Sequence, residues 1–283
     1  MTLCMHVATK DALIVCSDGK SSLYHKKSDG SRKHVGFIYD EIKSYFYNDI
    51  VISVSGSTIY RKNDKKIYEF VDFFDDLYNE TPNMFDIKKF PSYLVSELYA
   101  SGKCDFGSSG CDFLVSGLSS TGEFEIYQIY GDSGEILKLS EFKDFGLIGI
   151  KSLAKSVLSD LIISKMSTES VLKILNFIAN MYCDYGKLIF DEMSDFKDSE
   201  NYLYMTSVDG ELIFYVFDLK TKKKKYVKFC SDGKIRYYSK LVRNEFGWKK
   251  TPPHEVVFLW IFKLDLIFFQ QFLLLFLTIY WFR

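Results

Sequence analysis

The start of the chain holds a residue that could act as both nucleophile and base. If Met1 is removed, Thr2 becomes the chain terminus and carries a hydroxyl beside a free α-amine. An unperturbed α-amine has a pKa of about 7.7–8.0, so near neutral pH it can accept the proton of that hydroxyl. Thr2 could therefore supply the nucleophile and the base of an acyl-transfer reaction by itself.

Two short apolar segments at the start of the chain are expected to pair. Residues 2–8 and 12–17 are rich in β-branched and apolar side chains, and a turn-type Lys-Asp pair separates them. This pattern predicts a β-hairpin. The hairpin would return the chain to its start and place Asp18 beside Thr2.

The order of these segments resembles that of the proteasome β-type family of N-terminal nucleophile hydrolases. The start of the family pattern matches Thr2, the turn, and the Val-Cys-Ser-Asp-Gly segment at 15–19. Residues 47–57 resemble the family strand that ends in a small residue and Gly56, ahead of a helix.

The resemblance continues through the middle of the chain. Residues 111–117 and 122–130 resemble the central hairpin of the family, and the segment at 145–149 leads into a helix from Ser152 in the same order. The match covers about residues 2–218 and rests on order and spacing.

The resemblance implies a threonine-type amidohydrolase acting on peptide bonds. Thr2 would be nucleophile and base, Asp18 and Lys43 would form the charge relay that tunes it, and the Gly56 N–H would be an oxyanion donor. The acyl-enzyme would be an ester on Thr2, resolved by water. Resolution by another amine would instead make a peptide ligase.

The family lysine can be placed in two ways. The family spacing between the lysine and the glycine, counted back from Gly56, leads to Ile42 or Lys43. Deleting one residue from that spacing selects Lys43. This placement requires an insertion between residues 19 and 42. Lys33 is the rival, with the insertion after it. We favour Lys43 because the strand that follows is better anchored, although both lysines could simply belong to a solvated loop.

Two positions depart from the family pattern. Ile150 stands where the family has a serine that helps to orient the terminal amine. The later Asp-x-x-Ser-Gly turn is shortened to Asp184-Tyr185-Gly186, which leaves Asp184 as the carried-over acid. Both losses fit either a divergent enzyme or a catalytically silent structural subunit of a proteasome-like assembly.

Helical periodicity indicates two pairs of helices, at 67–78 and 93–99 and at 152–163 and 167–182. Strands surround both pairs. This order predicts an α+β fold, a four-layer αββα sandwich of two packed antiparallel sheets flanked by helices.

Composition limits the partners and cofactors. The formal net charge is -1, which argues against nucleic acid as a partner. The six cysteines include no C-x-x-C pair, the four histidines do not cluster, and no secretory signal is recognised. We expect no cofactor, no metal and a cytoplasmic location. The expected partners are a peptide or protein substrate, further copies in a homo-oligomer or ring, and an ATPase.

The end of the chain differs in character. We divide the chain into a hydrolase domain at 2–219, a basic hairpin or linker at 220–256 and a hydrophobic tail at 257–283. The uncharged run within the tail is at the lower edge of the roughly 17–25 residues that cross a bilayer. The tail could be an anchor that associates the protein with a membrane, an oligomer contact or an out-of-frame extension.

Overall fold

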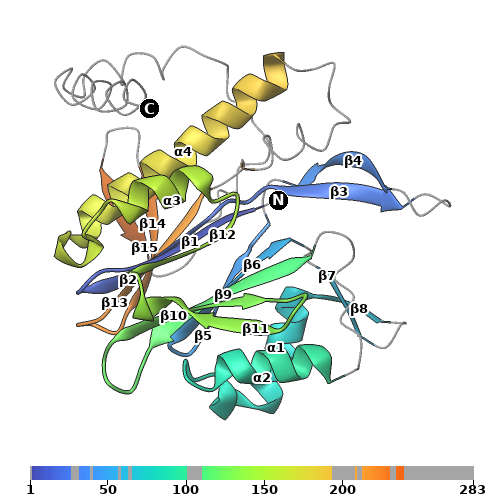
Figure 1. Ribbon diagram of the computed structural model, residues 1–283, viewed down its shortest axis with the longest axis horizontal. Helices are drawn as coiled ribbons and strands as arrows, with labels where there is room; N and C mark the ends of the chain where they lie inside the picture. The colour runs from blue at the N-terminus through green and yellow to red at the C-terminus, as the bar shows by residue number, and fades with distance from the viewer. Residues whose placement is uncertain are drawn as a thin grey trace, which may run out of the picture. The chain divides into compact units, whose positions relative to one another are not determined.

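Two antiparallel β-sheets packed face to face, each with helices on its outer side, make up the described fold (Figure 1). The computed structural model describes residues 2–26, 32–38, 41–56, 59–62, 66–100, 110–192, 208, 212–229 and 234–238. These residues belong to one structural unit, 1–241. The predicted α+β sandwich is confirmed.

The first sheet has six strands in the order β12-β1-β2-β13-β14-β15, and all of its neighbours are antiparallel. The two ends of the described chain therefore meet in one sheet. Its strands are β1 (Leu3–Ala8), β2 (Ala12–Ser17), β12 (Phe145–Gly149), β13 (Ile213–Asp218), β14 (Lys224–Phe229) and β15 (Ile235–Tyr238).

The second sheet has five strands in the order β11-β10-β9-β6-β5. Two further hairpins, β3-β4 and β7-β8, form separate two-stranded sheets. The strands are β3 (Ser21–Lys26), β4 (Arg32–Ile38), β5 (Ser44–Tyr47), β6 (Ile50–Gly56), β7 (Ile59–Lys62), β8 (Lys66–Glu69), β9 (Cys111–Leu118), β10 (Phe124–Tyr130) and β11 (Glu135–Lys138).

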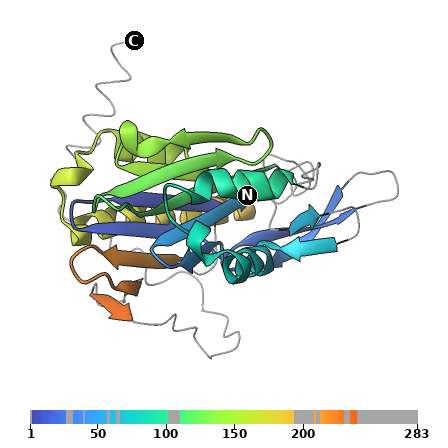
Figure 2. The same cartoon turned by 90° about the horizontal axis from the view of Figure 1, so that it is seen from below.

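The helices cover the outer faces of the two sheets (Figures 1 and 2). The five-stranded sheet is covered by α1 (Phe70–Glu80) and α2 (Phe90–Tyr99), with the 3-10 turn η1 (Pro82–Met84) between them. The six-stranded sheet is covered by α3 (Ser152–Ser159) and α4 (Thr168–Glu192). Two more 3-10 turns are η3 (Leu139–Glu141) and η4 (Ile163–Lys165).

The first hairpin forms as predicted. Cys4 pairs with Ser17 and Ala8 with Leu13 across the β1-β2 ladder. Every residue of β2 is buried because one face packs under α4 and the other faces the second sheet. The strand therefore lacks the polar alternation of a half-exposed strand. Its end returns Asp18 to the start of β1, where the Asp18 N–H donates to the Leu3 carbonyl at 3.1 Å.

The last helix is longer than predicted, and the turn expected at 184–186 is wrong. α4 runs from Thr168 to Glu192, so Asp184 and Gly186 lie inside a helix. A glycine costs a helix interior only about 1 kcal/mol relative to alanine. That cost is small enough for α4 to continue through Gly186, after the buried Tyr182 and Cys183.

Two hairpins fill positions where the family pattern has none. The insertion placed between 19 and 42 contains the β3-β4 hairpin. The β7-β8 hairpin lies between β6 and α1, so the strand that ends at Gly56 does not lead directly into a helix as expected.

The basic segment after 219 supplies β14 and β15, which extend the six-stranded sheet beyond β13. The side chains of Val227, Phe229 and Ile235 pack on the core beneath α4. The domain boundary drawn at 219 stays a prediction, and the tail at 257–283 lies outside the described residues.

Candidate functional site

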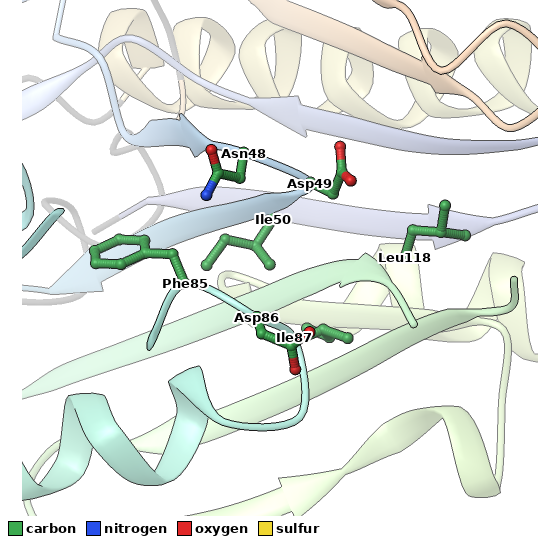
Figure 3. Close-up of a pocket in the computed structure, with 7 residues that line it drawn as sticks. All are labelled: Asn48, Asp49, Ile50, Phe85, Asp86, Ile87 and Leu118. Atoms are coloured by element: carbon green, nitrogen blue, oxygen red, sulfur yellow. The ribbon is translucent and has the colours of Figure 1, made fainter. Parts of the chain in front are cut away.

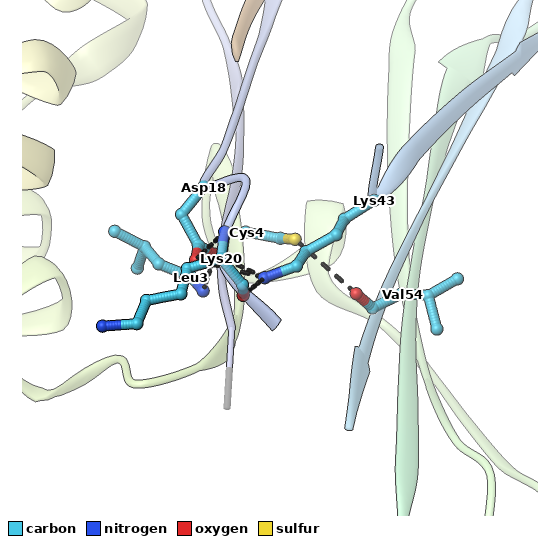
Figure 4. A network of polar contacts seen from close by, with 6 residues as sticks. All are labelled: Leu3, Cys4, Asp18, Lys20, Lys43 and Val54. Atoms are coloured by element: carbon cyan, nitrogen blue, oxygen red, sulfur yellow. Dashed lines mark hydrogen bonds and ion pairs between the residues drawn. The ribbon is translucent and has the colours of Figure 1, made fainter. Parts of the chain in front are cut away.

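A buried ion pair joins Asp18 and Lys43 at one end of the two sheets (Figure 4). Lys43 Nζ donates to both carboxylate oxygens of Asp18, each at 3.1 Å, and both side chains are inaccessible to solvent. Asp18 follows β2 of the first sheet, whereas Lys43 precedes β5 of the second sheet. The ion pair thus links the two sheets beside the start of β1.

Backbone groups complete the environment of this pair. The Leu3 N–H donates to Asp18 Oδ1 at 2.7 Å, and the Lys20 N–H donates to Oδ2 at 3.2 Å. Lys43 Nζ also donates to the Lys20 carbonyl. Burial raises the pKa of Asp18 above its ordinary value, and the charge of Lys43 and the two N–H donors act in the opposite direction. The lysine ammonium is therefore held by three acceptor atoms in a fixed position.

Thr2 is the residue immediately before the amide that binds Asp18. It is buried just before β1, and its carbonyl accepts a hydrogen bond from the Ile150 N–H at 3.0 Å. Gly149 stands next to this carbonyl with φ of +81°, and a Cβ there would overlap the Thr2 carbonyl oxygen. A glycine is required at this position for β12 to approach Thr2 so closely.

Gly56 ends β6 with φ of +99°, in the left-handed region that favours glycine. A Cβ on Gly56 would overlap the carbonyl oxygen of Gly110, which precedes β9. The residue next to it is Ser55, whose Oγ would lie 3.1 Å from a Cβ on Gly149, beside the Thr2 carbonyl. The position of Gly56 at a sharp strand end agrees with the sequence expectation of a glycine turn.

The other sequence candidates lie elsewhere. Lys33 is in β4, where it pairs with His25, and its side chain is outside the described residues. Asp184 is exposed on α4, and no described contact joins it to Thr2, Asp18 or Lys43. Ile150 is buried in the core beneath the helices that cover the six-stranded sheet.

A second buried polar group lies between the sheets and was missed by sequence reasoning. His6 Nδ1 lies 2.6 Å from Ser116 Oγ, and His6 Nε2 lies 2.7 Å from Ser53 Oγ. Ser53 Oγ in turn lies 2.6 Å from Ser44 Oγ, beside Lys43 in the chain. Burial lowers the pKa of His6 to about 3, so the imidazole is neutral at physiological pH.

The sequence pattern that could have indicated His6 is the alternation of side chains along a strand. His6 is four residues after Thr2 on β1, and residues two or four apart on a strand share a face. Its burial next to serines of β6 and β9 could not be read from an isolated histidine.

A pocket of about 400 Å³ lies at the opposite end of β6 from Gly56 (Figure 3). Its lining mixes carboxylates with apolar side chains: Asn48, Asp49, Ile50, Phe85, Asp86, Ile87 and Leu118. None of the sequence-predicted site residues lines it.

None of the described His, Cys, Asp and Glu side chains gather in groups of three or more that could hold a metal ion. Among the described helices, none is both long and apolar enough to cross a membrane.

Comparisons with known proteins show a distant structural similarity. The sequence matches no protein-family model and no curated protein. Solved structures of Anbu proteins are similar to this one. The Gly-1 mutant from Hyphomicrobium sp. strain MC1 has a TM-score of 0.48 at 12% identity, covering 77% of this chain and 82% of that chain.

Two further Anbu structures are similar at the same level. The helical assembly from Pseudomonas aeruginosa has a TM-score of 0.46 at 14% identity, covering 76% of this chain and 81% of that one. The ancestral beta-subunit from Yersinia bercovieri has a TM-score of 0.44 at 11% identity, covering 79% and 85%. Similarity this distant assigns neither a family nor an activity to this chain.

Proposed function

We propose that this protein is a threonine-type N-terminal nucleophile amidohydrolase that cleaves peptide bonds. The observation that carries the proposal is the buried Asp18–Lys43 ion pair, which lies beside Thr2 and is bound by the amide of the next residue. Removing two charges from water is costly unless they are paired and hydrogen-bonded. A buried pair beside a candidate nucleophile is therefore typical of a tuned active site.

The reaction begins with the removal of Met1, which frees the α-amine of Thr2. The amine takes the proton of the Thr2 hydroxyl as the oxygen attacks the carbonyl carbon of a substrate peptide bond. The tetrahedral intermediate then collapses, the substrate C–N bond breaks, and the leaving amine takes the proton from the Thr2 ammonium. The acyl group stays on Thr2 as an ester.

Lys43 supplies the electrostatic part of this mechanism. Its ammonium is held by Asp18 and the Lys20 carbonyl. A fixed positive charge near the Thr2 amine favours the neutral, proton-accepting form of that amine. The same charge stabilises the oxyanion that develops on the substrate.

Gly56 is the proposed oxyanion donor. Its backbone N–H lies at a turn that only glycine accommodates, because φ is positive and a Cβ would meet Gly110. A missing side chain also leaves room for the substrate backbone to approach.

Water resolves the ester in the proposed hydrolase. If a second amine attacks the ester instead, the product is a new peptide bond and the protein is a peptide ligase. Product analysis by mass separates the two, because hydrolysis adds the mass of water to each cleaved peptide.

A silent structural subunit is the second candidate function, and Ile150 favours it. The turn at 149–151 presents no hydroxyl to the Thr2 amine, because the Ile150 side chain is buried in the apolar core. In this case the sandwich would fold with the Asp18–Lys43 pair intact, but the protein would not cleave peptides at Thr2.

The proposed function includes the association of several copies of this chain. We expect homo-oligomers, and sedimentation velocity of the full chain tests this directly. The Pseudomonas aeruginosa Anbu structure is described as a helical assembly, which is a property of that protein. An ATPase partner and a membrane contact through 257–283 stay predictions from the sequence.

Peptidase assays with two substitutions at Thr2 test the proposed function. Thr2→Ala should reduce cleavage of fluorogenic peptides to background, whereas Thr2→Ser retains a hydroxyl and should keep measurable activity. The melting temperature of each variant controls for folding. Cleavage that persists in Thr2→Ala contradicts the proposal. No turnover by a wild-type chain with a free Thr2 amine favours the silent subunit.

A further inference from the structure

Ser55 of β6 is a polar residue near Thr2 that the mechanism above does not use. Along β6, alternate residues face opposite sides of the sheet. Ile52 and Val54 pack against the helices α1 and α2, whereas Ser53 bonds to His6 of the first sheet. Ser55 is two residues after Ser53, so its side chain faces the first sheet as well.

The space around Gly149 places Ser55 next to Thr2. A Cβ built on Gly149 would overlap the carbonyl oxygen of Thr2, and it would lie 3.1 Å from Ser55 Oγ. The Ser55 hydroxyl therefore lies close to the carbonyl group of Thr2, which already occupies the space that a side chain on Gly149 would need.

Ser55 is a buried residue, with 7% of its surface exposed. Its hydroxyl makes no hydrogen bond within the described part of the chain, in contrast to Ser44, Ser53 and Ser116 between the same sheets. Its hydroxyl oxygen can therefore accept a hydrogen bond from a neighbouring donor. An α-amine on Thr2 would provide that donor.

We infer that Ser55 is a positioning residue whose hydroxyl oxygen accepts a hydrogen bond from the α-amine of Thr2. This inference rests on the proposed function, in which that amine is the base. Accepting one N–H fixes the rotation of the amine and directs its lone pair toward the Thr2 hydroxyl. The bond strengthens as the amine becomes an ammonium during attack, since hydrogen bonds to charged groups are stronger than neutral ones.

Three variants of the full chain isolate this bond. Ser55→Ala removes the hydroxyl, and Ser55→Thr restores one at the same place. Ser140→Ala is the matched control, because Ser140 Oγ likewise makes no hydrogen bond among the described residues but lies in η3. Each chain is made with a cleavable N-terminal fusion, so that Thr2 has a free amine whether or not Met1 is normally removed.

The first measurement does not depend on catalysis. The rate of carbamylation of the Thr2 amine by cyanate, followed by the mass of the N-terminal peptide from pH 5 to 10, reports the pKa of that amine. Losing an acceptor that stabilises the ammonium should lower this pKa by about one in Ser55→Ala, which corresponds to about a tenfold change in proton affinity. Ser55→Thr and Ser140→Ala should titrate like the wild type.

The second measurement is peptide cleavage. Ser55→Ala should lower kcat about tenfold with KM unchanged, and the acidic limb of kcat/KM should move to lower pH. An unchanged amine pKa in Ser55→Ala, or an equal change in Ser140→Ala, overturns the inference. If the amine pKa shifts but no chain cleaves peptides, the Ser55 bond stands and the peptidase function fails.

Discussion

The interior between the five-stranded sheet and its helices differs sharply from the interior between the two sheets. Beneath α1 and α2 the core is apolar and aromatic, and the rings of Phe70, Phe74 and Phe113 pack edge to face or stack. Between the sheets the apolar clusters are small, and Asp18, Lys43 and the His6 group are buried beside them.

This difference suggests that one region mainly stabilises the fold and the other supplies the polar groups of the candidate site. Apolar burial against the helices stabilises the fold without requiring particular polar partners. Buried charges and hydroxyls between the sheets are costly and depend on exact pairing. We therefore expect substitutions beneath the helices to lower stability alone, and substitutions between the sheets to lower activity as well.

The largest effect is expected from the ion pair. Lys43→Ala leaves Asp18 buried without its cation and should lower the free energy of unfolding by about 3–5 kcal/mol. Turnover per folded molecule should fall at least ~10²-fold, as for the loss of one electrostatic stabiliser. Urea unfolding and peptidase kinetics measure the two effects.

Lys33→Ala is the matched control for Lys43, and it should change neither quantity appreciably. The reverse order of the two variants would place the functional lysine at Lys33. Equal, small effects would favour the silent subunit.

A substitution beneath the helices tests the other side of the comparison. Phe74 is inaccessible to solvent, so Phe74→Ala should lower the free energy of unfolding by about 3–5 kcal/mol through cavity formation. The activity of the folded fraction should be unchanged. Phe142→Ala is the control, because Phe142 is 75% exposed and its loss should stay within about 0.5 kcal/mol. A large drop in kcat for Phe74→Ala would contradict the expectation that substitutions beneath the helices change stability but not activity.

The buried imidazole makes stability depend on pH. His6 titrates at about 3 in the folded chain, against about 6.5 when unfolded. Between these values only the unfolded state binds the proton, so stability falls as pH falls below about 6.5.

We compare His6→Gln with the wild type by urea unfolding at pH 7 and pH 5. The wild type should lose about 2 kcal/mol more than the variant over this interval. Equal losses in both proteins would mean that His6 is accessible to protons in the folded state.

The smallest effect is expected from the end of the chain. Removing everything after His254 should leave the melting temperature unchanged, because the last described strand of the six-stranded sheet ends at Tyr238. Soluble yield should rise when the Phe- and Leu-rich segment is removed. A truncated chain that fails to fold would show that the tail completes the core.

The sequence predicted the parts of this arrangement that depend on local pattern. Strand composition and a turn pair predicted the first hairpin, and counting back from Gly56 led to Lys43, which the structure brings beside Asp18. The role of both residues in catalysis stays a proposal.

What the sequence missed depends on contacts between distant segments. The neighbours of His6 and Ser55 between the sheets come from segments that lie 47 or more residues away in the chain. The continuation of α4 past Asp184 was also missed, because a turn-type Gly186 costs a helix only about 1 kcal/mol and does not by itself end it.

The most direct test of the central claim is the site at which a peptide epoxyketone attaches. This reagent forms a stable ring only with a hydroxyl and a neighbouring free amine, so it reports both functions of Thr2 at once. We predict that the purified chain lacks Met1, that the adduct maps to Thr2, and that Thr2→Ala is not labelled. A chain that retains Met1, or an adduct that maps to Cys4 or Cys16 or persists in Thr2→Ala, would contradict the account.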